Sequence, residues 1–157
     1  TAAALGDYAE AEQRYHASQQ LFQQIGNQWG VAASLTRLGY HALALNDPPA
    51  ARRFFHTALQ IAHETRAVPC MLEALMGFAA LLTETDPSQA VNLAFLVEQH
   101  PAATKESKDR AAEVRSRRAV HQSFPNEQKL QIGQDSDHIL DKVVATLLHQ
   151  CDDLRGD

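Results

Sequence analysis

The side chains that most often carry chemistry are present in this sequence but do not converge on one place. The chain has 8 histidines and 2 cysteines. His56 and His63 are seven positions apart, which on one helix separates them by roughly 10 Å, too far to share a metal ion without a bridging ligand. We therefore expect His16, His56 and His63 to lie on the surface or between helices.

A second group of ligand-type side chains gathers near the C-terminus and comprises Asp137, His138 and Asp141. Two or three such ligands without fixed supporting hydrogen bonds rarely hold a metal ion. His149 and Cys151 point about 200° apart around an ideal helix, so they do not form a ligand pair. Cys70 follows a proline in an apolar stretch and is expected to be a small core residue.

Motifs that position phosphates, nucleophiles or zinc are also missing. The sequence has no Gly-x-x-x-x-Gly-Lys, Gly-x-Gly-x-x-Gly, Gly-x-Ser-x-Gly or His-Glu-x-x-His. We predict no catalytic, metal or cofactor-binding residues and no enzymatic activity, because no nucleophile and base converge to support an enzyme built on helical hairpins.

The composition favours a helical protein that does not bind nucleic acid. The 157 residues are 45% hydrophobic but only 6% aromatic, and alanine and leucine dominate, which predicts an all-α fold. The 14 basic and 19 acidic residues give a net charge of −5, the wrong sign for gripping phosphate backbones. Two distant cysteines fit no disulfide framework, so a reducing compartment is the simpler interpretation.

The sequence shows neither a membrane-spanning segment nor a signal peptide. No apolar run reaches the roughly 18 residues that a membrane span needs, and the N-terminus lacks the layout of a signal peptide. We expect no membrane partner and a cytoplasmic location. The absence of an initiator methionine suggests a fragment of a longer polypeptide.

The sequence repeats itself after a shift of 40 residues. The shift superposes Ala11 on Ala51, Tyr15 on Phe55 and Leu35 on Leu75, and a third copy appears with one residue deleted. Self-similarity at such a period indicates stacked supersecondary units. Apolar residues within each unit recur every three or four positions, so each unit is predicted to be a pair of helices.

Helix-breaking residues mark the turns between these helices. They cluster at Gly6-Asp7, Asn46-Asp47-Pro48-Pro49 and Thr85-Asp86-Pro87. An aspartate at the N-cap followed by proline at the first helical position predicts helix starts in the second and third copies.

These residues resemble the tetratricopeptide repeat. The middle copy supplies Leu38-Gly39, Ala42, Asn46 at the usual glycine position, and then Ala51, Phe55 and Ala58; the first supplies Gly6, Tyr8, Ala11, Tyr15 and Ser18. The resemblance covers residues 1–100 and implies a right-handed α-solenoid of antiparallel helix pairs. A 40-residue period, longer than the usual 34, is similar to that of the C-terminal arrays of large bacterial signal-transduction ATPases and transcriptional regulators.

The resemblance also implies a binding groove lined by the first helix of each pair. The corresponding positions here are Ala33, Thr36, Arg37, Tyr40, Glu73, Met76, Ala80 and Thr83. Family members that bind chaperone tails clamp a terminal carboxylate with lysine and asparagine. Thr36 and Tyr40 stand at clamp positions here and Glu73 would repel a carboxylate, so that partner is not expected. The groove residues could equally pack against upstream repeats or the late helices.

Residues 101–157 depart from the repeat. A helix is predicted to open within 100–110 and run to about Arg118, a loop to cover 121–135, and an amphipathic helix to span 136–154. Residues 105–118 carry a net charge of +3 and residues 126–157 one of −4, which favours attraction between these segments or to a neighbouring molecule. The late helices are expected to cap the solenoid, with partner recruitment as the alternative.

The sequence therefore predicts a non-catalytic interaction or sensor scaffold at the C-terminal end of a larger bacterial regulator. Its partner would be a protein, a peptide or an upstream domain of the parent chain. The alternative is a structural element that forms homodimers through the truncated first repeat or the stripe from Ile139 to Leu148.

Overall fold

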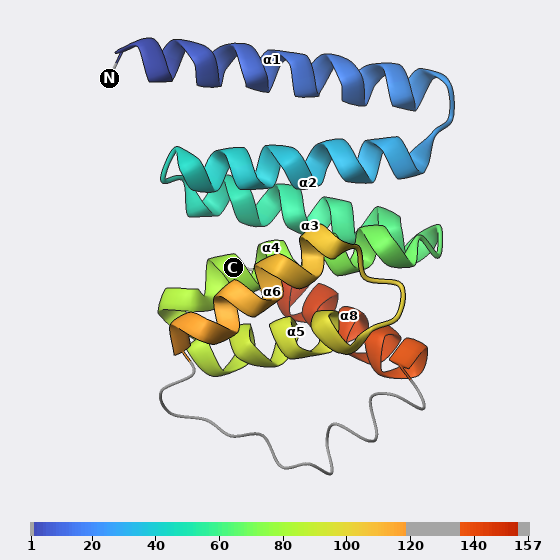
Figure 1. Cartoon of the computed structure of the whole chain (residues 1–157). Coiled ribbons are helices and arrows are strands. Elements are labelled where there is room, and N and C mark those ends of the chain that lie inside the picture. The colour runs from blue at the N-terminus through green and yellow to red at the C-terminus, as the bar shows by residue number, and fades with distance from the viewer. Residues whose placement is uncertain (1, 119–135, 154–157) are drawn as a thin grey trace.

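The computed structural model describes residues 2–118 and 136–153, which form helices joined by short turns and contain no strand. The helices are α1 (Ala2–Gln24), α2 (Gln28–Ala44), α3 (Pro48–Glu64), α4 (Val68–Thr85), α5 (Pro87–Gln99), α6 (Lys105–Arg118) and α8 (Ser136–Asp153). From α1 to α6 each helix packs against the next along the chain (Figure 1). The fold is an all-α, tetratricopeptide-like helical repeat, as the sequence predicted.

Three turns of the array share one geometry. The second residue after the helix adopts a left-handed conformation at Gly26, Asn46 and Arg66, where φ is 71°, 58° and 56°. In each turn the next amide donates to a carbonyl five residues back, with N···O distances of 2.8 to 2.9 Å: Asn27 to Phe22, Asp47 to Ala42 and Ala67 to Ala62. This bond is typical of a Schellman motif. These left-handed residues are spaced by half of the 40-residue repeat, because each repeat contains two helices and each of these helices is followed by such a turn.

The predicted helix starts at the second and third copies are confirmed. The side chain of Asp47 accepts a hydrogen bond from the backbone amide of Ala50 at 3.2 Å, and that of Asp86 accepts one from Gln89 at 3.2 Å. In each case a proline occupies the first turn. Proline has no amide hydrogen to donate. The first turn of a helix does not need that hydrogen, whereas continuation of the previous helix would, so proline ends one helix and begins the next.

One predicted boundary is wrong. α1 runs without a break through Gly6-Asp7, where the cost of a glycine inside a helix is only about 1 kcal/mol. The helix expected to open within 100–110 does so at Lys105, where the Thr104 hydroxyl accepts from the Ser107 amide at 3.1 Å and caps the helix. The final helix, Ser136–Asp153, is confirmed; the predicted loop at 121–135 lies outside the described residues.

The centre of the core is a phenylalanine held between two glycines. Phe55 of α3 is fully buried. A Cβ atom at Gly39 of α2 would lie 2.5 Å from its ring, and one at Gly77 of α4 would lie closer still. Real Cβ atoms do not approach so closely, so both glycines let α2 and α4 close on this ring. Gly39 and Phe55 are both positions of the repeat pattern identified in the sequence.

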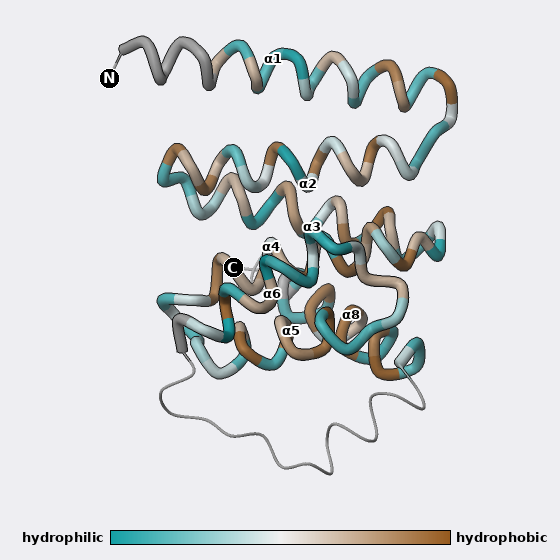
Figure 2. Tube along the Cα trace, viewed as in Figure 1, coloured by the Kyte–Doolittle hydropathy of each residue, from teal (hydrophilic) through white to brown (hydrophobic). Residues whose placement is uncertain are grey.

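α4 is the central helix of the array. Its buried side chains extend from Cys70 to Ala79, and it contacts α2, α3, α5 and α6. By length and composition alone this helix would also suit a membrane span, but half of it is buried inside the fold as expected for a core helix. Hydrophobic segments are frequent along the lower helices, whereas α1 alternates in hydropathy (Figure 2).

Cys70 is 3% exposed, as expected for a core residue. Burial, followed by the nearby Glu73 carboxylate, raises the pKa of its thiol to about 11. At pH 8 only about one thiol in a thousand would then be ionised, and only the thiolate reacts. In a Cys151→Ser variant we expect thiol-disulfide reagents to label Cys70 at least 100-fold more slowly in the native chain than in urea. Equal rates would show that α4 is not packed as described.

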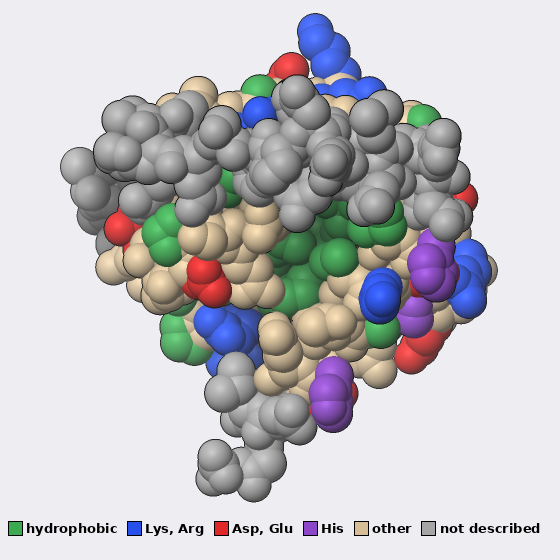
Figure 3. All heavy atoms as spheres, turned by 90° about the horizontal axis from the view of Figure 1, so that it is seen from below, with side chains coloured by type: hydrophobic (Ala, Val, Ile, Leu, Met, Phe, Trp, Pro, Cys, Tyr) green, Lys and Arg blue, Asp and Glu red, His purple; other side chains and the backbone are tan. Residues whose placement is uncertain are grey.

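α8 packs across α3 and not onto the end of the array. Its apolar stripe places Leu140, Val144 and Leu147 in the core. In Figure 1, α6 crosses in front of α4, and α8 lies behind α5. Figure 3 views the molecule from below, where a hollow floored by hydrophobic side chains borders the residues that are not described.

Aspartates along α8 meet histidines and an arginine of the repeat helices. Asp141 accepts two hydrogen bonds from Arg66, at 2.9 and 3.1 Å, and lies 3.7 Å from His63. Asp137 bonds the buried His100 at 3.1 Å, and Asp152 lies 3.6 Å from the buried His56. α6 instead pairs Arg115 with Glu98 of α5. The expected mutual attraction of the two late helices is therefore wrong for the described side chains, because each binds the repeat body.

Candidate peptide-binding groove

The inner surface of the array is formed by α2, α4 and α6, which contact one another in that order. α6 stands to α4 and α5 as α4 stands to α2 and α3, so it takes the place of the next inner helix although its sequence does not match the repeat. Two adjoining pockets open on this surface. We call them together the inner groove.

The first pocket has a volume of about 580 Å³. It lies between the inner helices and the side of α1. Its lining residues are Ala11, Tyr15, Thr36, Arg37, Tyr40, His41, Glu73, Glu106, Ser107 and Arg110. Arginine and glutamate side chains are balanced here, and two tyrosines provide aromatic surface.

The second pocket has a volume of about 380 Å³ and lies between α4 and α6. Its lining residues are Tyr40, Met76, Ala80, Thr83, Glu84, Arg110, Glu113 and Val114. The Thr83 hydroxyl donates to the Ala79 carbonyl at 2.9 Å, so the surface between the flanking glutamates is largely apolar.

The structure brings together seven of the eight groove positions expected from the sequence. Thr36, Arg37, Tyr40 and Glu73 line the first pocket, and Met76, Ala80 and Thr83 line the second together with Tyr40. Ala33 lies on α2 outside both linings. Repeat spacing located these residues because α2 and α4 are successive inner helices in the same register.

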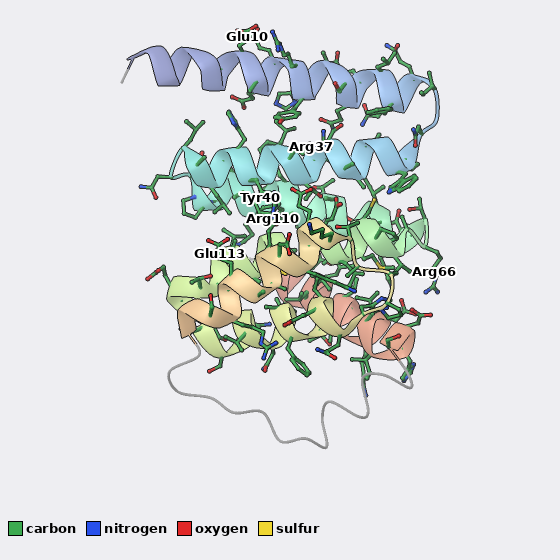
Figure 4. All side chains as sticks on the ribbon, in the orientation of Figure 1. Glu10, Arg37, Tyr40, Arg66, Arg110 and Glu113 are labelled. Carbon is green, nitrogen blue, oxygen red and sulfur yellow. The ribbon has the colours of Figure 1, made fainter. Side chains whose placement is uncertain are left out.

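Tyr40 lies at the centre of the groove and joins it to the core. The guanidinium carbon of Arg110 lies 4.1 Å from the centroid of the Tyr40 ring, a cation–π contact between α6 and α2 (Figure 4). On its other side the ring meets Phe55 edge-on, with centroids 5.2 Å apart and planes at 75°. Burial raises the pKa of the Tyr40 hydroxyl, and Arg110 opposes that shift.

Glu73 is the most unusual charge in the groove. It is half-buried on α4, and within the described residues no arginine, lysine or histidine nitrogen lies within 4.0 Å of its carboxylate. Burial and then the Glu106 carboxylate raise the pKa of Glu73, while Arg37 and Arg110 act in the opposite direction. The folded chain therefore disfavours the ionised form of Glu73.

This shift predicts a pH-dependent gain in stability for Glu73→Gln. A carboxyl group whose pKa is higher in the folded than in the unfolded chain lowers the free energy of unfolding when the pH is above the folded pKa. This loss of stability disappears as the pH falls through the folded and then the unfolded pKa. We expect the variant to be more stable than the parent at pH 7, with the difference shrinking towards pH 4. Urea unfolding at both pH values measures this. Glu64→Gln, the same change at an exposed position, should show no such trend.

The sequence left open that the late helices pack against the groove residues, and α6 does so, but its individual lining residues were not predicted. Glu106, Ser107, Arg110, Glu113 and Val114 all line it, as do Ala11 and Tyr15 of α1. Only the departure of α6 from the repeat pattern hid its role. Its basic character was visible, and a basic helix beside an inner surface with glutamates is a signal for the contact that forms.

No metal centre was found in the part of the chain that the structure describes. No three histidine, cysteine, aspartate or glutamate side chains there are arranged to hold an ion. Asp141, one of the weak cluster near the C-terminus, is engaged by Arg66. His16 lies near Phe54, with ring centroids 6.2 Å apart, and His56 is buried between helices.

Comparison with known proteins supports the interpretation of the repeat. A sequence-family model described as the tetratricopeptide repeat matches residues 1–64. This segment is therefore similar to the tetratricopeptide repeat. No curated protein and no solved structure matches the chain. Tetratricopeptide repeats generally mediate protein–protein interaction and are typically non-catalytic scaffolds, and stacked repeats of this kind present extended concave surfaces to their partners.

Proposed function

We propose that this chain is a non-catalytic scaffold whose inner groove binds an extended peptide segment of another protein or of its own parent chain. The observation that carries the proposal is the groove itself. It joins two pockets of about 580 and 380 Å³ across α2, α4 and α6, an extended surface of the kind that suits a peptide.

The proposal places the chain in the cytoplasm, as part of a larger bacterial regulatory or signal-transduction protein. The 40-residue period and the resemblance to C-terminal arrays of such regulators support this assignment, which is an argument by analogy. Homodimerisation through the stripe from Ile139 to Leu148 is less well supported, since Leu140, Val144 and Leu147 are covered within one chain.

The test is selection of binders from a displayed library of random peptides of about 12 residues with the full chain. Arg37→Glu reverses a charge on the exposed rim of the groove. Arg52→Glu makes the same change at an exposed position of α3 outside both pockets. Tyr40 is kept, because its contact with Phe55 would couple its loss to unfolding.

We expect selected peptides to bind the parent and Arg52→Glu alike, and their affinity for Arg37→Glu to differ at least about 10-fold from that for the parent, the typical effect of one charged contact. A selection without specific binders, or binders indifferent to the rim charge and to every other groove substitution, would refute the proposed function.

A further inference from the structure

The contact between Tyr40 and Arg110 divides the inner groove into two parts. These two residues alone line both pockets, and the guanidinium lies 4.1 Å from the ring centroid. Arg110 is held in place from its own helix by Glu106 at 2.8 Å. A peptide that follows the groove must therefore place different side chains on the two sides of this contact.

Glu73 is the carboxylate of the first pocket that lacks an ion pair within the described chain, in a lining where two arginines and two glutamates balance. Glu73 and Glu106 lie on opposite walls, on α4 and α6, and each raises the energy of a further negative charge there. Glu106 is paired with Arg110, whereas no cationic nitrogen of the described chain approaches Glu73 within 4.0 Å. Across both pockets the lining holds four glutamates and two arginines.

The aromatic wall of the groove already accepts a guanidinium from within the chain. Arg110 stacks on Tyr40 and shows that this ring face, edged by carboxylates, is a suitable environment for a positive group. Tyr15 adds a second aromatic ring to the first pocket. A cationic side chain of a partner would meet the Tyr15 ring and the Glu73 carboxylate in the first pocket.

The second pocket suits an apolar side chain. Met76 and Ala80 of α4 face Val114 of α6 across it. Met76 is 2% exposed and forms the floor, and the flexible thioether can adapt to differently shaped aliphatic groups. The two glutamates of this pocket are outside the apolar floor and do not line the first pocket.

We propose that the partner segment carries a lysine or arginine that enters the first pocket beside Glu73, and an aliphatic side chain that enters the second pocket over Met76. Tyr40 and Arg110 lie between the two side chains. This inference rests on the proposed function and adds the chemical class of the partner. The partner is a peptide with a basic and an aliphatic side chain, and not one that is held by its terminal carboxylate.

The test uses the peptides selected by the full chain from the random library, resynthesised and measured by isothermal titration calorimetry. We expect them to be enriched in lysine or arginine near an aliphatic residue, and replacement of the basic residue by glutamine to weaken binding about 10-fold or more. Glu73→Gln should produce a similar loss, and the two changes together should lose little more than either alone. Glu64→Gln is the control.

Ala80→Asp supplies an independent measure of the second pocket. It adds a charge beside Met76 and should abolish the preference for an aliphatic residue while the preference for a basic one remains. Circular dichroism confirms that each variant is helical, and Glu73→Gln is expected to be stabilised, so loss of binding by that variant cannot follow from unfolding.

The failures of the two proposals are distinguishable. Peptides that depend on Arg37 but carry acidic residues, or whose affinity Glu73→Gln leaves unchanged, would overturn the inference while the scaffold function stands. Absence of any groove-dependent peptide would overturn both.

Discussion

Replacing Phe55 by alanine is expected to lower the free energy of unfolding by about 3–5 kcal/mol, the usual cost of removing a fully buried phenylalanine. The cost should lie at the upper end of that range for a structural reason. The ring fills the space between Gly39 and Gly77, and glycines carry no side chain that could move into the cavity left behind.

The matched control is Phe54→Ala, the same change one position earlier. Phe54 is only half-buried and should cost less than half as much, since less apolar surface returns to water. Urea unfolding followed by circular dichroism measures both. A cost below about 1 kcal/mol at Phe55, or equal costs at the two positions, would show that the repeat register is wrong.

Leu147→Asp is expected to release α8 from the repeat body. Leu147 is buried between α8 and the array, so the variant loses about 1.5–3 kcal/mol of apolar burial and must also leave a carboxylate in an apolar contact. We expect the amide protection of α8 against hydrogen exchange to fall by about 100-fold while that of α4 is unchanged.

Thr146→Asp is the control for this prediction. It introduces the same charge one residue earlier, on the exposed side of α8, and should leave protection near that of the parent. Light scattering across a dilution series addresses the oligomerisation alternative. A dimer that Leu147→Asp dissociates, with α8 protection unchanged at monomer concentrations, would contradict the intramolecular docking described above.

Local signals in the sequence were sufficient for most of the fold. The caps at Asp47 and Asp86 and the spacing around Phe55 depend on residues within a few positions, and the repeat then fixed the register of α2 and α4. Asn46 was assigned correctly to a glycine position, and its φ of 58° explains why. Gly6-Asp7 was wrongly predicted as a turn: the cost of a glycine inside a helix is only about 1 kcal/mol, and α1 continues through it.

The rest of the site depends on pairings between distant residues, which no local pattern records. Arg66 and Asp141 are 75 positions apart, and their bond directs α8 onto α3. The contact of Arg110 with Tyr40 joins a helix outside the repeat pattern to one within it. The charge imbalance of the late segments indicated that they would bind something, but three-dimensional packing decides that each binds the repeat body.

The measurement that tests the account most directly is titration of the isotope-labelled chain with the tightest library-selected peptide, followed by amide chemical shifts. We expect the largest shifts on the inner helices, at Arg37, Tyr40, Glu73 and Ser107, and a different dependence of these shifts on peptide concentration in Arg37→Glu. Shifts confined to α8 or the outer side of α3, with the inner helices unchanged, would contradict the assignment of the inner groove as the binding surface.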